Sequence, residues 1–105
     1  MTTAAATIAP PSVVARASGV LDSDIADRLA GELLALTSSG GEVVVDLARV
    51  RLIDSGALSV FVVAAKHARA HGGRLVLRHP SGVVADVLRV ASLSDRGLSL
   101  ELAED

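Results

Sequence analysis

The chain has 105 residues, no cysteine, one aromatic residue and a formal net charge of -2 at pH 7. This length fits a single domain, and the lack of cysteine excludes disulfides and thiolate metal sites. The slightly acidic balance and the near absence of aromatic rings disfavour nucleic acid as a partner, because surfaces that bind it are basic and often stack bases on aromatic side chains.

The ends and the apolar runs of the chain predict its location. No apolar run reaches the ~18 residues of a membrane span, and residues 1–11 lack the basic and apolar regions of a signal peptide. We therefore expect a cytoplasmic domain at residues 12–105 without membrane insertion. A flexible lead-in at residues 1–11, with a short edge strand near Ile8, would precede it.

The first third of the chain predicts a strand followed by a helix. Residues 12–21 are rich in β-branched side chains, which favours a strand. Asp22, Ser23 and Asp24 can cap a following helix, and acidic side chains are favourable at the positive end of the helix dipole. Gly40-Gly41 stops this helix, whose apolar positions recur at helical spacing: Ile25, Leu29, Leu33 and Leu36.

The middle of the chain predicts a second strand and a second helix. Residues 42–48 form a continuous apolar run, typical of a central strand buried on both faces, and residues 50–53 predict a short extended piece. Asp54 can cap a helix that Gly72-Gly73 ends. One face of this helix is predicted to carry Leu58, Phe61, Val62, Ala65 and Ala68.

The last third adds a strand at residues 74–79, a helix from a turn at residues 80–82 to about Ala91, and a strand at residues 98–102. Strands that alternate with helices imply crossover connections. We therefore predict an α/β fold with a four- to five-stranded, mostly parallel or mixed sheet flanked by α-helices.

The last predicted helix should turn Val83, Val84, Val87 and Leu88 toward the core. The residues expected to be buried in the whole domain are Val43, Val45, Leu58, Val62, Leu75, Leu77 and Leu88.

Motifs of enzymes and cofactor sites do not fit this sequence. It has no phosphate-binding glycine loop, and the two glycine pairs follow helices instead of opening them. His67 and His71 stand four apart, but without the H-E-x-x-H frame they are predicted to be surface histidines, like the turn residue His79. Ser55 lacks the nucleophile elbow. Asp46 lacks the acidic pair and the strand-end lysine of a phospho-aspartate receiver. We expect no enzymatic activity, metal or cofactor.

The stretch Asp54-Ser55-Gly56 leaves two interpretations open. In one, Asp54 is an N-cap and the small residues simply fill an ordinary first turn. In the other, Ser55 is an exposed acceptor for phosphate at a rigid helix start, where an added charge of about -1.5 to -2 would change whatever docks there.

Several motifs resemble the STAS domain of bacterial anti-sigma factor antagonists. They are Gly19-Val20-Leu21-Asp22, the run "VVVDLARVRLIDSGAL" at residues 43–58, Gly72-Gly73-Arg74-Leu75, and Pro80. Their order and spacing cover roughly residues 12–102. The usual D-[ST]-[ST]-G-L of the family reads Asp54-Ser55-Gly56-Ala57-Leu58 here, so the second hydroxyl is missing.

The resemblance implies a partner-switching protein. An anti-sigma factor with a histidine-kinase-like ATPase fold would bind the chain and phosphorylate Ser55, and a metal-dependent serine phosphatase would reset it. The resemblance places Asp22, Asp54, Ser55, Gly56 and Ala57 at the partner-binding surface. Gly56 also resembles the STAS subunits of lipid-transporting ABC systems, which dock on an ATPase, so that alternative stays open.

Overall fold

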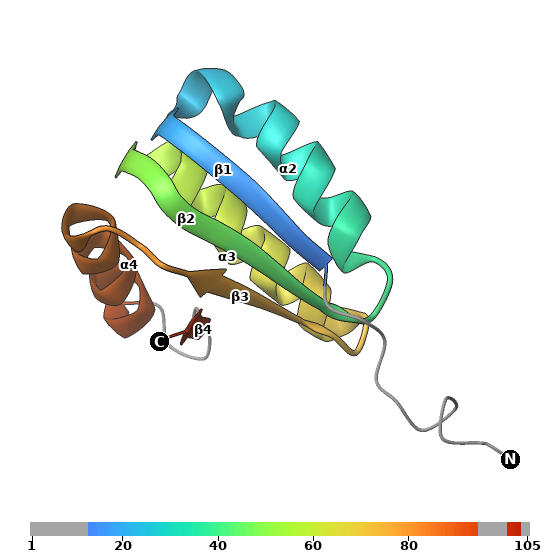
Figure 1. Cartoon of the computed structure of the whole chain (residues 1–105). Helices are drawn as coiled ribbons and strands as arrows, with labels where there is room; N and C mark the ends of the chain where they lie inside the picture. Colours follow the sequence, from blue (N-terminus) through green and yellow to red (C-terminus); the bar gives the residue numbers. More distant parts are fainter. Residues whose placement is uncertain (1–12, 95–100, 104–105) are drawn as a thin grey trace, which may run out of the picture.

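The computed structural model describes residues 13–94 and 101–103. These residues form four strands and three helices in alternation (Figure 1). The strands are β1 (Val13–Leu21), β2 (Glu42–Ile53), β3 (Arg74–Arg78) and β4 (Glu101–Ala103), and the helices are α2 (Ser23–Thr37), α3 (Ser55–Ala70) and α4 (Gly82–Ser94). The predicted lead-in, the edge strand near Ile8 and the start of the last predicted strand lie outside the described residues.

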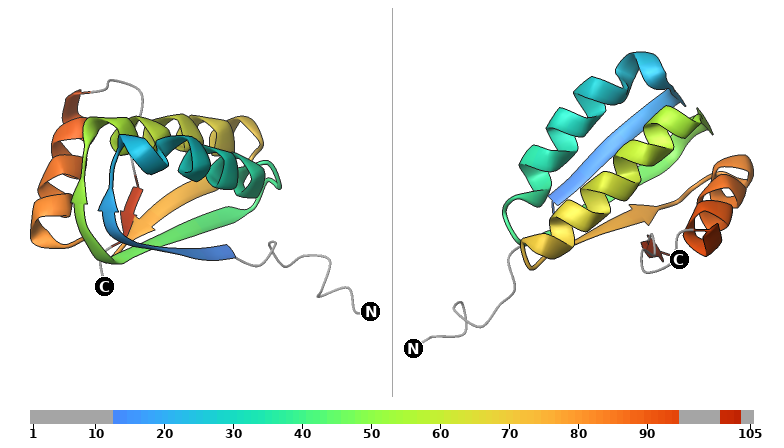
Figure 2. Two further views of the ribbon diagram at one scale, coloured as in Figure 1. Left: turned by 90° about the horizontal axis from the view of Figure 1, so that it is seen from above. Right: turned by 180° about the vertical axis from the view of Figure 1, so that it is seen from behind.

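The four strands form one parallel sheet in the order β1-β2-β3-β4. Helices α2 and α3 lie side by side over one face of this sheet (Figure 2). Strand β3 pairs with the first half of β2 only, because the last of their pairs is Asp46 with Arg78. Helix α4 packs against β2, and the Ser81 hydroxyl donates to the carbonyl oxygen of Val50 at 3.4 Å. The predicted α/β fold with a parallel sheet is confirmed.

Strand β2 is longer than predicted, and its pairing with β1 continues to Ile53 through two irregularities. Its register with β1 shifts between Arg16 and Ser18, and again between Gly19 and Val20. Each shift adds one residue to β2. The prediction of a strand that stops at Ala48, before a separate extended piece, is therefore wrong.

These two shifts explain the spacing of the buried residues in β2. Leu47, Val50 and Ile53 all face the core although they are three residues apart, which a regular strand with a period of two does not allow. The Asp46 carboxylate holds the first shift by accepting from the Ala48 N–H at 2.9 Å. This bond is the main reason that the pKa of Asp46 is lowered; burial opposes the shift, and the charges of His79, Arg78 and Arg16 add to it.

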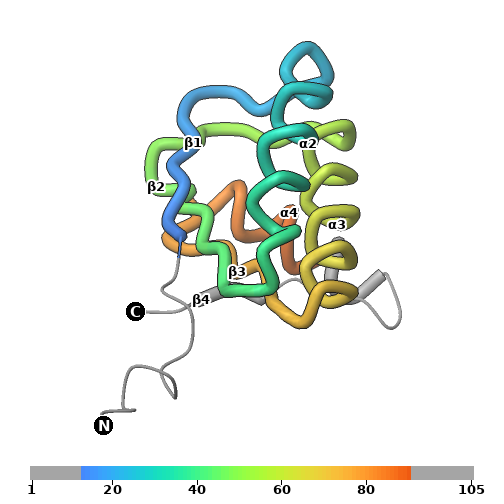
Figure 3. The backbone as a smooth tube through the Cα atoms, turned by 90° about the vertical axis from the view of Figure 1, so that its right-hand side faces the viewer, coloured from blue at the N-terminus to red at the C-terminus, as the bar shows by residue number. Residues whose placement is uncertain are grey.

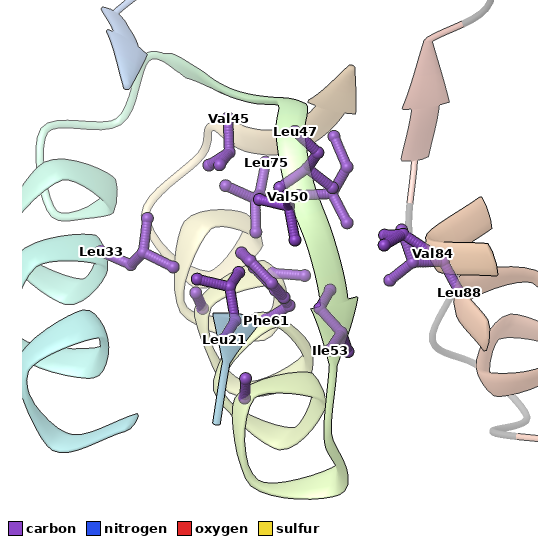
Figure 4. Close-up of a cluster of buried hydrophobic side chains, with 14 of the residues drawn as sticks. Leu21, Leu33, Val45, Leu47, Val50, Ile53, Phe61, Leu75, Val84 and Leu88 are labelled. Carbon is purple, nitrogen blue, oxygen red and sulfur yellow. The ribbon is translucent and has the colours of Figure 1, made fainter. Parts of the chain in front are cut away.

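The core lies between the sheet and its helices (Figure 4). Phe61, the single aromatic residue, is fully buried in it. Helix α4 contributes Val84 and Leu88, whereas Val83 is 58% exposed, so its predicted inward position is wrong. The buried residues confirmed by the structure are Val43, Val45, Leu75, Leu77 and Leu88; Leu58 and Val62 are only partly buried.

A buried polar contact joins α2 to α3. The hydroxyl of Thr37, fully buried, donates to the Leu33 carbonyl oxygen at 2.7 Å and lies 2.8 Å from Nδ1 of His67. The hydroxyl and the ring nitrogen therefore share a hydrogen bond between the two helices. His67 is half-buried, and its prediction as a surface residue is wrong. His71 is exposed, as predicted.

The two glycine pairs end their helices and also touch each other. Gly40 and Gly72 have φ angles of 82° and 81°, which favour glycine. A Cβ at Gly73 would overlap the carbonyl oxygen of Gly41, and one at Gly40 would lie 2.8 Å from the carbonyl oxygen of His71. The glycine pairs that end the two helices, as predicted, therefore also form the contact between the two loops.

Candidate functional site

The ends of β1 and β2 bring two Asp-Ser steps together. Leu21 and Ile53 are partners in the sheet, and the Asp54 N–H donates to the Leu21 carbonyl oxygen at 3.0 Å. Asp22-Ser23 follows the first of these strands and Asp54-Ser55 follows the second. We call the surface formed by Asp22, Ser23, Asp54, Ser55 and Gly56 the Asp-Ser edge.

Helices α2 and α3 both begin at this edge (Figure 3). Each follows a strand of one parallel sheet, so the two helix dipoles point in similar directions and both positive ends meet here. Asp22 caps α2 through its Oδ1, which accepts from the Asp24 N–H at 3.0 Å. The sequence predicted that an aspartate caps each of these two helices, and the structure confirms it.

The Asp54 carboxylate accepts hydrogen bonds from the first turns of both helices. Its Oδ1 accepts from the Ala57 N–H at 3.0 Å and so caps α3. Its Oδ2 accepts from the N–H of Ser23 at 3.0 Å and from the Ser23 hydroxyl at 3.2 Å. The Asp54 side chain therefore ties the start of α2 to the start of α3.

These hydrogen bonds keep Asp54 ionised. The Ala57 N–H contributes most to a pKa below the ordinary value of an aspartate, partial burial opposes the shift, and the two bonds from Ser23 lower the pKa further. Each of these donors stabilises the carboxylate form and leaves the protonated form with fewer partners. Near neutral pH the edge therefore carries a fixed negative charge between two positive helix ends.

Gly56 allows the two helices to begin this close together. A Cβ at position 56 would lie 2.9 Å from the Ser23 hydroxyl oxygen and 3.3 Å from Asp54 Oδ1. Ala57, the next residue, is fully buried in the core. Its side chain is not available to a partner, contrary to the role expected for it, because the first turn of α3 points it at the sheet.

Ser55 is the exposed residue at the centre of the edge. It is the first residue of α3, and its hydroxyl makes no hydrogen bond with any residue that the structure describes. Ser59, one turn further along, donates its hydroxyl to the Ser55 carbonyl oxygen at 2.9 Å. Ser55 is thus fixed through its backbone while its hydroxyl is open to solvent.

The sequence predicted Asp22, Asp54, Ser55 and Gly56 as site residues, and the structure brings these four together. Ser23 was predicted only as one of three possible caps of the first helix, and not as a site residue. The signal was present in the sequence, because Leu21-Asp22-Ser23 and Ile53-Asp54-Ser55 repeat the same order of an apolar residue, Asp and Ser. The register of two parallel strands turns this repeat into a contact.

Exposed apolar side chains lie beside the edge. Val20 and Leu52 are partners in the sheet, 41% and 51% exposed, at the ends of β1 and β2. Two hollows of about 220 and 240 Å³ lie further along β1, and neither is lined by Asp54, Ser55 or Gly56. The Asp-Ser edge therefore lies outside both hollows, next to a pair of exposed apolar side chains.

The described residues, 13–94 and 101–103, contain neither a candidate membrane span nor a candidate metal site. No helix there is long and apolar enough to cross a membrane. No three histidine or acidic side chains there gather closely enough to hold a metal ion.

Fold and site together define a small parallel α/β domain that presents a rigid helix start on its surface. The chain belongs to the STAS domain family, because the family model described as "Mlab, STAS domain" matches residues 4–102. A search of curated protein sequences gives no match.

Solved structures with the same fold include one anti-sigma factor antagonist and a second protein provisionally assigned as one. The unphosphorylated form of the anti-sigma factor antagonist SpoIIAA has a TM-score of 0.70 and 17% identity, over 94% of this chain and 84% of that one. A Thermotoga maritima protein, provisionally assigned as an anti-sigma factor antagonist, has a TM-score of 0.75 and 22% identity, over 90% of this chain and 80% of that one. At these identities the likeness establishes the fold.

Proposed function

We propose that this chain is an anti-sigma factor antagonist that regulates transcription in the bacterial cytoplasm. It binds an anti-sigma factor with a histidine-kinase-like ATPase fold, and phosphorylation of Ser55 ends the complex. The observation that carries the proposal is the Ser55 hydroxyl, exposed and unengaged among the described residues at a fixed helix start. Membership of the STAS family and the two similar structures support it.

The neighbouring serines are less suitable acceptors. The Ser23 hydroxyl donates to Asp54, and the Ser59 hydroxyl donates to a backbone carbonyl oxygen. A kinase would have to break these bonds before either oxygen could attack. Ser23 also stands between two acidic residues, Asp22 and Asp24, whose charge would oppose a phosphate.

The reaction transfers the γ-phosphoryl group of ATP to Ser55. A base of the kinase accepts the hydroxyl proton, the Ser55 oxygen bonds to the γ-phosphorus, and ADP leaves. The product gains a charge of about -1.5 to -2. The N–H groups at the start of α3 tolerate that charge, while Asp54 repels it. The fold then stays intact and the docked surface is altered.

A metal-dependent serine phosphatase would complete the cycle. Water replaces the Ser55 oxygen at phosphorus, which releases inorganic phosphate and restores the hydroxyl. No residue of this chain has to act as a catalyst in either step.

The test combines the protein, its kinase-type anti-sigma factor and ATP, followed by mass spectrometry of the modified peptide. We expect stoichiometric phosphate on Ser55 and loss of the complex. Ser55→Ala should bind and stay bound. Ser55→Glu should bind at least tenfold more weakly, which corresponds to about 1.4 kcal/mol, although a carboxylate carries only part of the charge of a phosphate.

Ser59→Ala is the matched control, since Ser59 is an exposed serine one turn along the same helix. It should be phosphorylated and released like the wild type. The free energy of unfolding of Ser55→Glu should stay within about 0.5 kcal/mol of the wild-type value, as for other surface changes. Phosphate on a different serine, or an active kinase that leaves the chain unmodified, would refute the role of Ser55.

Gly56 supports a second candidate, a STAS subunit that docks on the ATPase of a lipid-transporting ABC system without a phosphoswitch. The absence of a side chain at position 56 removes the second hydroxyl that the phosphorylated members of the family usually carry there. Affinity purification from the source cell separates the two functions. Recovery of a transporter ATPase, with no kinase-type anti-sigma factor, would favour this second function.

A further inference from the structure

Ser23 is engaged more extensively than its exposed position requires. Its N–H and its hydroxyl both donate to the same oxygen, Oδ2 of Asp54, at 3.0 and 3.2 Å. The two residues are 31 positions apart in the chain. Only the pairing of β1 with β2 brings them together, through Leu21 and Ile53. The pair therefore connects two elements and is not a local helix cap.

The space beside Ser23 is matched to Gly56. A Cβ at position 56 would lie 2.9 Å from the Ser23 hydroxyl oxygen and 3.4 Å from the Ser23 Cα. The hydroxyl of α2 thus occupies the room that a side chain on α3 would need. The Ser23 hydroxyl, supplied by the neighbouring helix, therefore lies beside the position at which the family usually carries its second hydroxyl.

Building on the proposed function, we propose that Ser23 is a positioning and specificity-determining residue of the Asp-Ser edge. It fixes the orientation of the Asp54 carboxylate and presents its hydroxyl oxygen beside Gly56. The partner therefore docks on the starts of α2 and α3 together, and not on α3 alone.

The chemistry of the edge defines what this partner must offer. The single hydrogen of the Ser23 hydroxyl is given to Asp54, so its oxygen can only accept a further hydrogen bond. The residues beside it, Asp22, Asp24 and Asp54, are acidic. A group that donates and carries positive charge, such as an arginine guanidinium, meets both conditions.

The positioning role can be tested without any partner, by following the Asp54 carboxyl carbon in an NMR pH titration. Ser23→Ala removes one donor to the carboxylate, so the pKa of Asp54 should rise. Ser23→Thr keeps the hydroxyl and should return the pKa to the wild-type value. Ser38→Ala is the matched control, because Ser38 is an exposed serine at the other end of α2 that donates to Leu34. An unchanged pKa of Asp54 in Ser23→Ala would overturn the proposal.

Gly56→Ala tests the shared space, because its methyl group enters that space and adds no hydrogen-bond donor beside Asp54. The new side chain should displace the Ser23 hydroxyl from Asp54 and raise the pKa of Asp54, as Ser23→Ala does. The two substitutions remove the same bond, so the double variant should show less than the sum of the two shifts. Fully additive shifts would show that the two sites act independently, against the proposal.

The specificity role is measured as affinity for the kinase-type anti-sigma factor. Ser23→Ala should weaken this complex roughly fivefold, as expected for one hydrogen bond, and Ser23→Thr should weaken it less. Equal binding of Ser23→Ala and the wild type would refute this role. If the wild type itself fails to bind, the proposed function fails, while the Asp54 titration still decides whether Ser23 is a positioning residue.

Discussion

Asp54 shows how one side chain can organise a surface. It accepts hydrogen bonds from Ala57 and from Ser23, and so fixes the starts of two helices. The sequence alone predicted its bond within α3, because a capping aspartate acts on residues next to it in the chain. Its bonds to Ser23 depend on strand pairing, which no local pattern encodes.

The lowered pKa of Asp54 predicts a pH-dependent contribution to stability. The pKa in the folded protein lies below that of the unfolded chain, about 3.9. The contribution is therefore complete above about pH 4 and is lost as the pH falls through the folded-state pKa. Chemical denaturation of the wild type and Asp54→Asn between pH 7 and pH 2.5 should show the wild type more stable at pH 7, with the difference shrinking below pH 4.

Asp46 also has a lowered pKa. Its contribution to stability is the same in the wild type and in Asp54→Asn, so it cancels in the difference between them. Ser38→Ala, which changes no charge, serves as the reference variant. A stability difference for Asp54→Asn that is the same at pH 7 and pH 2.5 would contradict the assignment.

At the scale of elements, the loops that follow α2 and α3 touch each other through their glycine pairs. The sequence predicted Gly40-Gly41 and Gly72-Gly73 as helix stops, since glycine tolerates the positive φ of a helix end. It could not predict that the pairs touch. Gly73 has its N–H bonded to the Ala68 carbonyl oxygen at 2.9 Å while its Cα faces Gly41.

Substituting two glycines by alanine should give opposite results. Gly73→Ala puts a methyl group into the backbone of the other loop and should lower the free energy of unfolding by about 2 kcal/mol or more. Gly31→Ala lies within α2 with open space around it, and it should raise the free energy of unfolding by about 0.5–1 kcal/mol. Urea denaturation measures both. Equal effects of the two substitutions would mean that the loop contact does not constrain the fold.

At the scale of the whole molecule, one core is shared by the sheet and all three described helices. Phe61 is its largest fully buried side chain. It packs in one cluster with residues from β1, β2, α2 and α4 (Figure 4). Stability of a domain this size is typically about 5–15 kcal/mol, so a single large cavity removes a substantial share.

Phe61→Ala should therefore lower the free energy of unfolding by about 3–5 kcal/mol. Val63→Ala is the matched control in the same helix, because Val63 is 53% exposed, and it should change the value by at most about 0.5 kcal/mol. Thermal and urea denaturation report both. A loss below about 1 kcal/mol for Phe61→Ala would mean that the core refills the cavity.

Much of the fold was determined by local patterns in the sequence. The apolar run at residues 42–48, the capping aspartates and the glycine stops each act within a few residues. They were enough to predict the order of the elements and the parallel sheet. They were not enough for the continuation of β2 to Ile53 or for the outward position of Val83, because these depend on what packs against each segment.

The sequence by itself determined that Asp54 begins a helix and that Ser55 stands first in it. Only the tertiary structure decided that Ser23 lies against Asp54, that Gly56 leaves room for its hydroxyl, and that the Ala57 side chain is buried. The physical reason is the pairing of β1 with β2. This pairing joins segments some thirty residues apart at a distance at which hydrogen bonds form, and no pattern along one segment contains the register between two.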